Sequence, residues 1–340
     1  MIRWTIEKKK LELQYTWKIS RNASDVKTNL FVRAEDGSHS GIGEVAPNIR
    51  YGESPEQTED QFTRFLSSKP ETIRTTAELI ESTSGLRLAP SLRFGIESAF
   101  THCICSRDKI QVQDFLGIGK ADAVPISFSI PIMDIGRIKE FYFQDNLKRF
   151  HFLKIKVNAE EMSECIRHLS SFTGQPLLID ANEAFTDVDV CIHSLEKIRK
   201  NNIELVEQPM PAGMDEESVY LKKYSPFPLF ADESVRDAAD FTTLKKMFDG
   251  ANIKLMTAGG YRNAIRLLNE ARECGMKTMI GCMVETTLGI SSGLNLCSLA
   301  DYADLDSYLV LKEEPFGLVK EENGILFFTE NAGSHLKNMS

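Results

Sequence analysis

The middle of the chain carries the stretch His151-Phe152-Leu153-Lys154-Ile155-Lys156-Val157. Its alternation of apolar and charged residues predicts a short β-strand, in which successive side chains point to opposite faces. Lys154 and Lys156 then share one face, and the apolar residues share the other. The apolar face can pack under a helix, which leaves two neighbouring lysines inside a sheet or barrel. Because burying like charges is costly without counter-charge, this strand predicts a reactive site.

The composition indicates a folded globular protein. The chain has 340 residues, of which 42% are hydrophobic and 26% are charged, enough for one large domain and one smaller one. Its net charge of −9 disfavours non-specific nucleic-acid binding. We find no signal-peptide pattern and no apolar run of membrane-spanning length. The seven scattered cysteines suggest reduced thiols, so we expect a cytoplasmic protein with no nucleic-acid or membrane partner.

Residues 1–122 predict an α+β unit in which strands are followed by helices. A turn at Asp36-Gly37 closes a hairpin. The expected strands are Trp4–Lys10, Leu11–Ile19 and Asn29–Ala34, and the expected helices are 56–67, 71–83 and 91–105. We expect this unit to form a smaller domain beside the predicted strand at His151–Val157.

From Val124 onward, short β-rich runs alternate with helical patterns at intervals of 20–30 residues. This alternation predicts βα units and a parallel sheet, and eight such runs favour a β/α barrel over residues 123–311. A hairpin around Asn323-Gly324 follows, so we expect residues 312–340 to return to the first unit and complete it. The runs are Val124–Ile130, Phe152–Val157, Leu177–Asn182, Ile203–Glu207, Leu229–Glu233, Asn252–Met256, Thr278–Val284 and Ala303–Asp306.

Three acids stand at the ends of consecutive predicted strands: Asp180, Glu207 and Asp232. Catalytic groups of β/α barrels come from the C-terminal strand ends, so these carboxylates should converge. Without a cation they would repel one another. An all-oxygen ligand set favours Mg²⁺ or Mn²⁺ over zinc.

Two lysines, Lys156 and Lys254, lie on the second and sixth predicted strands, which face each other across an eight-stranded barrel. Burial and a nearby cation both lower the pKa of a lysine and make it a usable base. Two bases on opposite sides of one carbon suit a 1,1-proton transfer through a metal-held enediolate. We expect Lys154 to stabilise that enediolate or to contact a substrate carboxylate.

The last predicted strand ends with a second acidic pair, Asp304 and Asp306, which share one face. If both point into the barrel, they would attract a cationic group of the substrate. A solvated pair at a strand end is the alternative that the sequence leaves open.

Together these residues resemble the enolase superfamily, in the branch that contains muconate-lactonising enzymes and dipeptide epimerases. The resemblance implies a modified (β/α)7β barrel with an α+β N-terminal capping domain. It also implies Mg²⁺ on Asp180, Glu207 and Asp232, Lys156 and Lys254 as acid/base catalysts, and Glu233 in support of Lys254. The motifs that carry the resemblance are Lys154-Ile155-Lys156, Asp180-Ala181-Asn182, Glu207-Gln208-Pro209, Asp232-Glu233-Ser234 and Asn252-Ile253-Lys254-Leu255-Met256.

Within that branch, Asp304-Leu305-Asp306 is similar to the dipeptide epimerase signature. The resemblance implies an L,L-dipeptide whose α-ammonium is held by this acid pair and whose second α-carbon is inverted. It further implies substrate contacts at Ser127, Cys282 and Val284. Arg21 resembles the loop arginine that L-Ala-L-Glu epimerases use for the glutamate side chain. The sequence leaves open whether the second residue is glutamate, hydrophobic or cationic.

Other readings use parts of the same site. An o-succinylbenzoate synthase or a muconate cycloisomerase would employ the same lysines and metal, but neither substrate has an ammonium group for the acid pair. A Schiff-base aldolase with Lys254 as the nucleophile is a different enzyme class, and a barrel kept only for binding is a third possibility. The sequence also leaves open whether the chain forms a homo-oligomer.

Overall fold

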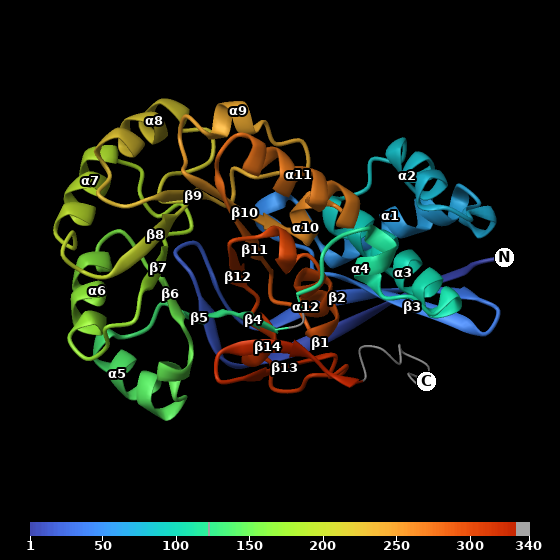
Figure 1. Cartoon of the computed structure of the whole chain (residues 1–340), viewed down its shortest axis with the longest axis horizontal. Coiled ribbons are helices and arrows are strands. Elements are labelled where there is room, and N and C mark those ends of the chain that lie inside the picture. Colours follow the sequence, from blue (N-terminus) through green and yellow to red (C-terminus); the bar gives the residue numbers. More distant parts are fainter. Residues whose placement is uncertain (122, 331–340) are drawn as a thin grey trace.

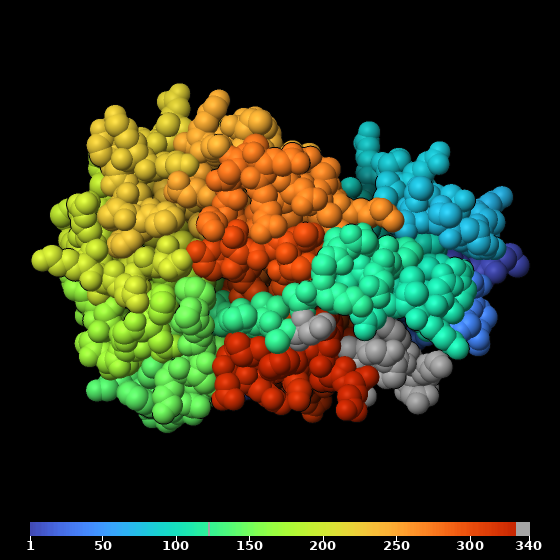
Figure 2. Space-filling model, in the orientation of Figure 1, coloured from blue at the N-terminus to red at the C-terminus, as the bar shows by residue number. Residues whose placement is uncertain are grey.

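A computed structural model describes residues 1–121 and 123–330. Figure 1 shows a cap of blue strands and blue-green helices packed beside a barrel whose helices form its outer wall. In the space-filling view the cap and the barrel form one continuous body, and α3 and α4 lie against the orange part of the barrel (Figure 2). In the described part of the chain, no helix is long and apolar enough to cross a membrane.

The cap begins with an antiparallel sheet in the order β1 (Arg3–Lys18), β2 (Ala23–Asp36) and β3 (His39–Val45). The predicted turn at Asp36-Gly37 joins β2 to β3. The two strands predicted within the first 19 residues form one strand, because the pairing with β2 runs unbroken from Arg3 to Glu12, and its register shifts only between Glu12 and Trp17. The cap helices are α1 (Pro55–Ser67), α2 (Thr76–Ser84), α3 (Pro90–Asp108) and α4 (Val112–Leu116).

Helix α3 lies very close to β3, and glycine makes this approach feasible. A Cβ atom built on Gly43 would lie 2.1 Å from the carbonyl oxygen of Gly95 on α3, a distance that no side chain tolerates. Trp4, Phe65 and Phe100 fill the space between sheet and helices, with the rings of Trp4 and Phe65 meeting edge to face at 5.1 Å. The cap therefore has its own hydrophobic core.

The barrel is an eight-stranded parallel sheet, as predicted, and its last strand lies beside its first. The strands are β5 (Ser127–Ile130), β6 (Phe152–Lys156), β7 (Leu177–Asp180), β8 (Ile203–Glu207), β9 (Leu229–Ala231), β10 (Gly250–Lys254), β11 (Lys277–Gly281) and β12 (Tyr302–Asp304). The helices are α5 (Ile135–Gln144), α6 (Met162–Ser170), α7 (Val188–Glu196), α8 (Asp215–Tyr224), α9 (Phe241–Leu244), α10 (Leu255–Ala258), α11 (Tyr261–Glu273) and α12 (Thr287–Asn295).

The interior of the barrel is divided into an apolar floor and a polar upper layer. Four buried side chains form the floor, with the rings of Phe152 and Tyr302 packed against them: Leu178, Leu205, Phe230 and Met279. Two residues further along, the inward positions carry an acid or a lysine on five strands, because side chains alternate with period two. These residues are Lys154, Asp180, Glu207, Asp232 and Asp304, whereas β11 carries Gly281 at this level. The apolar floor fills one end of the barrel, and the polar and charged side chains lie at the other end.

Two buried carboxylates of the cap accept hydrogen bonds from the start of barrel helices. Glu44 of β3 accepts from the backbone N–H groups of Thr286 and Gly289 at 3.0 and 2.9 Å, at the N-terminus of α12. Glu97 of α3 accepts from the backbone N–H of Arg262 at 3.1 Å, in the first turn of α11. Helix N-termini favour negative charge, so these contacts fix the cap on the barrel.

The C-terminal hairpin is present, as β13 (Val319–Glu322) and β14 (Ile325–Phe328), but its ladder partner is β4 (Ala123–Pro125). β4 is the segment that leads into the barrel. Leu318, next to the hairpin, packs against Phe31 and Ile42 of the cap sheet. The segment before the hairpin thus packs on the cap sheet, and the hairpin itself pairs with β4 through its backbone. Residues 331–340 of the predicted cap completion lie outside the described residues.

Candidate active site

The three predicted metal ligands meet at the open end of the barrel. Asp180, Glu207 and Asp232 are buried, and each offers a carboxylate oxygen within 4.8 Å of the others. Asp180 and Glu207 are direct neighbours in register, and Asp232 follows the next strand, β9. Burial raises the pKa of Glu207, and repulsion from Asp180 raises it further. Such a set of converging oxygens fits a hard divalent cation.

Lys154 lies at the centre of the acids. Its Nζ is 3.0 Å from Asp180, 2.7 Å from Glu207 and 2.7 Å from Asp304. The Glu207 Oε2 atom in this group is buried and has no contact with hydrogen-bond geometry. Burial opposes the charge of Lys154, but the surrounding acids outweigh it and hold the pKa of this lysine well above its usual range. The surrounding acids therefore favour the charged form of Lys154.

Lys156 and Lys254 approach the triad from different strands. Lys156 of β6 donates to Asp180, its partner in register on β7. Lys254, at the end of β10, donates to Asp232 at 2.7 Å. Burial alone would lower the pKa of Lys254, as the sequence led us to expect, but the charge of Asp232 outweighs burial and raises it. A cation bound by Asp232 would offset that charge and favour the predicted lowering.

The predicted acidic pair faces the seam where β12 meets β5. Asp304 accepts hydrogen bonds from Ser127 Oγ at 2.9 Å and from Lys154 Nζ at 2.7 Å. Asp306 accepts from the backbone N–H of Ser129. Burial, and then the charge of Asp304, raise the pKa of Asp306. Both acids point into the site, and Asp306 faces no lysine or arginine at ion-pair distance among the described residues.

The seventh-strand segment lies against the same seam. The Cys282 thiol donates to the carbonyl oxygen of Asp304 at 3.2 Å and lies 3.3 Å from Ser307 Oγ. The carbonyl oxygen of Val284 accepts from Asn29 Nδ2 of the cap at 2.9 Å. Cys282 and Val284 therefore border the acid pair and the cap, where the resemblance placed substrate contacts.

Arg21 reaches the site from the turn between β1 and β2. Its guanidinium makes ion pairs with Glu183 at 2.8 Å and with Glu233 at 2.7 Å. It also donates to the carbonyl oxygen of Asn182 at 2.6 Å. Arg21 thus lies over the strand ends, with barrel acids already bound to it.

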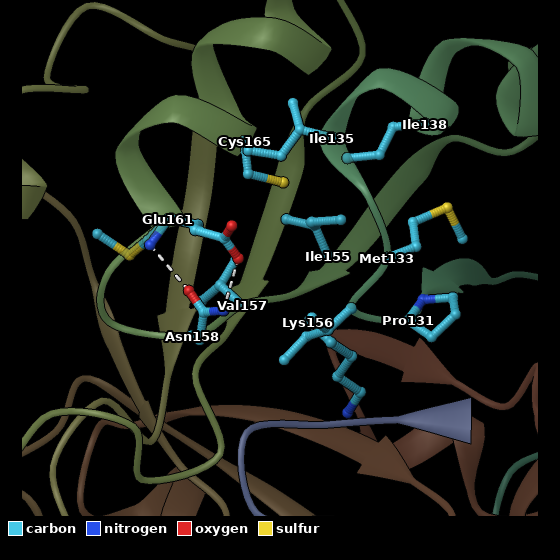
Figure 3. A pocket seen from close by; sticks show the side chains of 12 residues that line it. Pro131, Met133, Ile135, Ile138, Ile155, Lys156, Val157, Asn158, Glu161 and Cys165 are labelled. Carbon is cyan, nitrogen blue, oxygen red and sulfur yellow. Dashed lines mark hydrogen bonds between the residues drawn. The ribbon is translucent and has the colours of Figure 1, made fainter. Parts of the chain in front are cut away.

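Figure 3 shows how β6 is held in place beside this site. Apolar side chains from α5 and the segment before it, from β6 and from α6 gather on one side, among them Ile135, Ile155 and Cys165. The amine of Lys156 points away from this cluster. Packing on one face of the strand therefore presents the lysine on the other, as the alternation in the sequence predicts.

The family assignment follows from sequence comparison. The profile described as "Enolase C-terminal domain-like" matches residues 142–321, more than half of the chain. The chain belongs to the enolase superfamily. A relative named L-Ala-D/L-amino acid epimerase, from Pedosphaera parvula, is 32% identical over 328 residues, covering 94% of this chain and 93% of the relative.

Solved structures of the superfamily agree with the fold. An enolase family member from Agrobacterium tumefaciens, described as having homology to dipeptide epimerases and solved with bound sodium and L-Ala-L-Glu, has a TM-score of 0.89. It is 25% identical, and the match covers 98% of this chain and 99% of that one. A dipeptide epimerase from Methylococcus capsulatus, solved with Mg and L-Arg-D-Lys, has a TM-score of 0.84 at 24% identity and covers 96% and 97%.

Sequence reasoning missed several residues that complete the site. Ser129 binds Asp306, and Asn252 Nδ2 donates to Glu207 at 2.9 Å. Both stand two residues from a predicted site residue on the same strand, so period-two alternation could have found them. Arg50 and Glu183 also belong to the site, but their pairing across the cap and the barrel has no local signal.

Proposed function

We propose that this chain is a Mg²⁺-dependent dipeptide epimerase, an isomerase that inverts the α-carbon of the second residue of an L,L-dipeptide. One observation carries the proposal: an acid triad that fits a divalent cation lies between two lysines on different strands, and a second acid pair lies at the seam. The name of the Pedosphaera parvula relative supports it.

The charges at the barrel mouth support a divalent cation. The triad and the acid pair contribute five carboxylates, and the three lysines contribute three ammonium groups. If all are ionised, two negative charges remain uncompensated in a buried site, which is unfavourable. A divalent cation would neutralise both, and a zwitterionic dipeptide would then add no net charge.

In the proposed reaction the two lysines exchange protons with one carbon. A bound cation would supply charge stabilisation for an enediolate formed from the substrate carboxylate. Lys156 Nζ and Lys254 Nζ reach the triad from β6 and β10, so a carbon held beside the triad meets an amine on either side. One lysine takes the α-proton and the other returns a proton to the opposite face. Lys154 holds a fixed positive charge beside the developing anion.

Asp304 and Asp306 give the site a place for the substrate's α-ammonium. Lys154 and Ser127 already bind Asp304, which fixes its orientation. Asp306 is therefore the acid whose charge remains to be matched, and its nearest described donors belong to Ser129. A synthase or cycloisomerase substrate without an ammonium group would leave this buried carboxylate unmatched. Cys282 and Val284 border the same space and would contact the peptide.

The direct test is ¹H NMR in D₂O with Mg²⁺, using a library of L,L-dipeptides. We expect the α-proton signal of the second residue to disappear while the L,D diastereomer accumulates. The Asp306→Asn variant should keep its fold and lose most of this activity. If no dipeptide exchanges its α-proton, the epimerase proposal fails, and the cycloisomerase or synthase reaction becomes the better account of the lysines and the triad.

A further inference from the structure

Glu183 joins two cap loops to the barrel mouth. The Arg50 guanidinium, in the cap segment before α1, donates to both of its carboxylate oxygens at 2.6 and 2.7 Å. Arg21, in the turn between β1 and β2, binds it at 2.8 Å. The backbone N–H of Ala212, in the loop after β8, adds a contact at 2.8 Å. One carboxylate thus connects four segments that are distant in sequence.

Glu233 provides the second anchor for the same turn. Its Oε1 atom lies 2.7 Å from Arg21 Nη2 and accepts from Asn182 Nδ2 at 3.4 Å. Ser20, beside Arg21, donates to the carbonyl oxygen of Asn182 at 2.8 Å. The turn is therefore held at the ends of two barrel strands, because Asn182 follows β7 and Glu233 follows β9.

The backbone at Glu183 is held in an uncommon conformation. Asn182 and Glu183 have φ values of 44° and 66°, in the left-handed region that residues other than glycine rarely adopt. Such a conformation persists where the surrounding contacts fix it. Here the backbone N–H groups of Asn182 and Glu183 donate to Asp180 and to the carbonyl oxygen of Gln208 within the barrel, and the Glu183 side chain pairs with the two cap arginines.

The side-chain charges of the two arginines and the two glutamates sum to zero. The side chains of Arg21 and Arg50 are 29% and 32% exposed, and those of Glu183 and Glu233 are 5% and 2% exposed. Each arginine already has a carboxylate partner in a largely desolvated place. A third anionic group entering beside Arg21 would either displace Glu183 or Glu233 or lie against them, and both outcomes are unfavourable.

We propose that Arg21, Arg50, Glu183 and Glu233 form a charge-neutral latch that closes the cap over the site and selects dipeptides whose second side chain carries no negative charge. Glu183 is its specificity-determining and positioning residue. This inference rests on the proposed epimerase function and gives its substrate class. In this arrangement Arg21 closes the site and does not serve as a receptor for a glutamate side chain.

The test compares two dipeptides of the same shape that end in Gln or Glu. Both carry the same first residue, chosen as the one that gives the fastest exchange at the second residue in the dipeptide screen. We expect the wild-type kcat/KM to favour the Gln substrate by about tenfold. Glu183→Gln removes one negative charge beside Arg21 and should shift the ratio toward the Glu substrate by roughly tenfold. A wild-type preference for the Glu substrate would overturn the inference, and so would an unchanged ratio in the variant.

A matched control comes from the other end of the barrel. Glu321 of β13 pairs with Arg149 at 3.0 Å, with side chains 7% and 24% exposed. Glu321→Gln removes a comparable ion pair and should leave the ratio unchanged. Arg21→Gln separates the two roles of that arginine through the Gln substrate. Loss of a latch residue lowers kcat/KM for the Gln substrate, whereas loss of a receptor for the glutamate side chain leaves it unchanged.

A readout that needs no activity distinguishes failure of the latch from failure of the epimerase proposal. Trypsin cleaves after arginine, and Arg21 stands at the tip of the latched turn. Glu183→Gln should speed cleavage after Arg21 severalfold, and Glu321→Gln should not. Unchanged cleavage in Glu183→Gln would refute the latch. If cleavage rises but no dipeptide exchanges, the latch stands, while the epimerase proposal and the substrate selection inferred from it fail.

Discussion

Adding Mg²⁺ should raise the melting temperature of the metal-free protein, because the triad binds the ion only when it is assembled. A ligand at 100 times its Kd stabilises the folded state by about 2.7 kcal/mol. Unfolding entropy is about 2.1 cal/mol/K per residue, which for 340 residues gives roughly 0.7 kcal/mol/K. The expected rise is therefore about 4 °C. It is measured by calorimetry after EDTA treatment, across a series of Mg²⁺ concentrations.

The Glu207→Gln variant is the control for this experiment. The amide keeps the size of the side chain and can keep the contact with Asn252, but it removes one charge from the triad. We expect the Mg²⁺-dependent rise to fall below 1 °C, or about a quarter of the wild-type value. A wild-type protein whose melting temperature does not respond to Mg²⁺ would refute the assignment of the triad as a metal site. An equal response in the variant would remove Glu207 from the ligand set.

Three further predictions follow from the geometry. Lys156→Met and Lys254→Met should each abolish epimerisation. In D₂O, each variant should still exchange the α-proton of one diastereomer and not of the other. Exchange of both diastereomers by either variant would contradict the two-base arrangement. Asp306→Asn should raise KM more than it lowers kcat, by about tenfold or more, in steady-state assays, and an unchanged KM would remove this acid from the ammonium site. Gly43→Ala should lower the free energy of unfolding by about 2 kcal/mol in urea titrations, because its methyl group meets a carbonyl oxygen of α3, and wild-type stability would contradict this.

The barrel and its triad could be predicted because both depend on local pattern. Period-two alternation within each strand decides which side chains point inward, and parallel pairing places strand ends side by side. Asp180 and Glu207 are therefore neighbours as soon as β7 and β8 pair. Lys156 joins them through the pairing of β6 with β7. No long-range information beyond strand order is needed for these three residues.

The pKa of Lys254 and the partners of Arg21 depend on contacts between distant segments, which no local sequence pattern contains. Burial alone would lower the pKa of Lys254, which is what its apolar neighbours in the sequence suggest. The charge of Asp232 at 2.7 Å reverses the direction. The cap arginines are a second case, because the turn that holds Arg21 meets Glu183 and Glu233 only where the cap packs on the barrel. Sequence reasoning placed Arg21 near the site and could not identify its partners.

The charged residues at the barrel mouth form two separate sets. The lysines, the triad and the acid pair form a set with excess negative charge, which a divalent cation would balance. The latch residues form a set that is neutral on its own, with Arg21 and Arg50 facing Glu183 and Glu233. Because the latch residues pair among themselves, the cap can close without forming ion pairs with the catalytic lysines or the triad. The catalytic set can then respond to the ammonium and carboxylate groups that every dipeptide carries, while the latch responds to the second side chain, the part that differs between dipeptides.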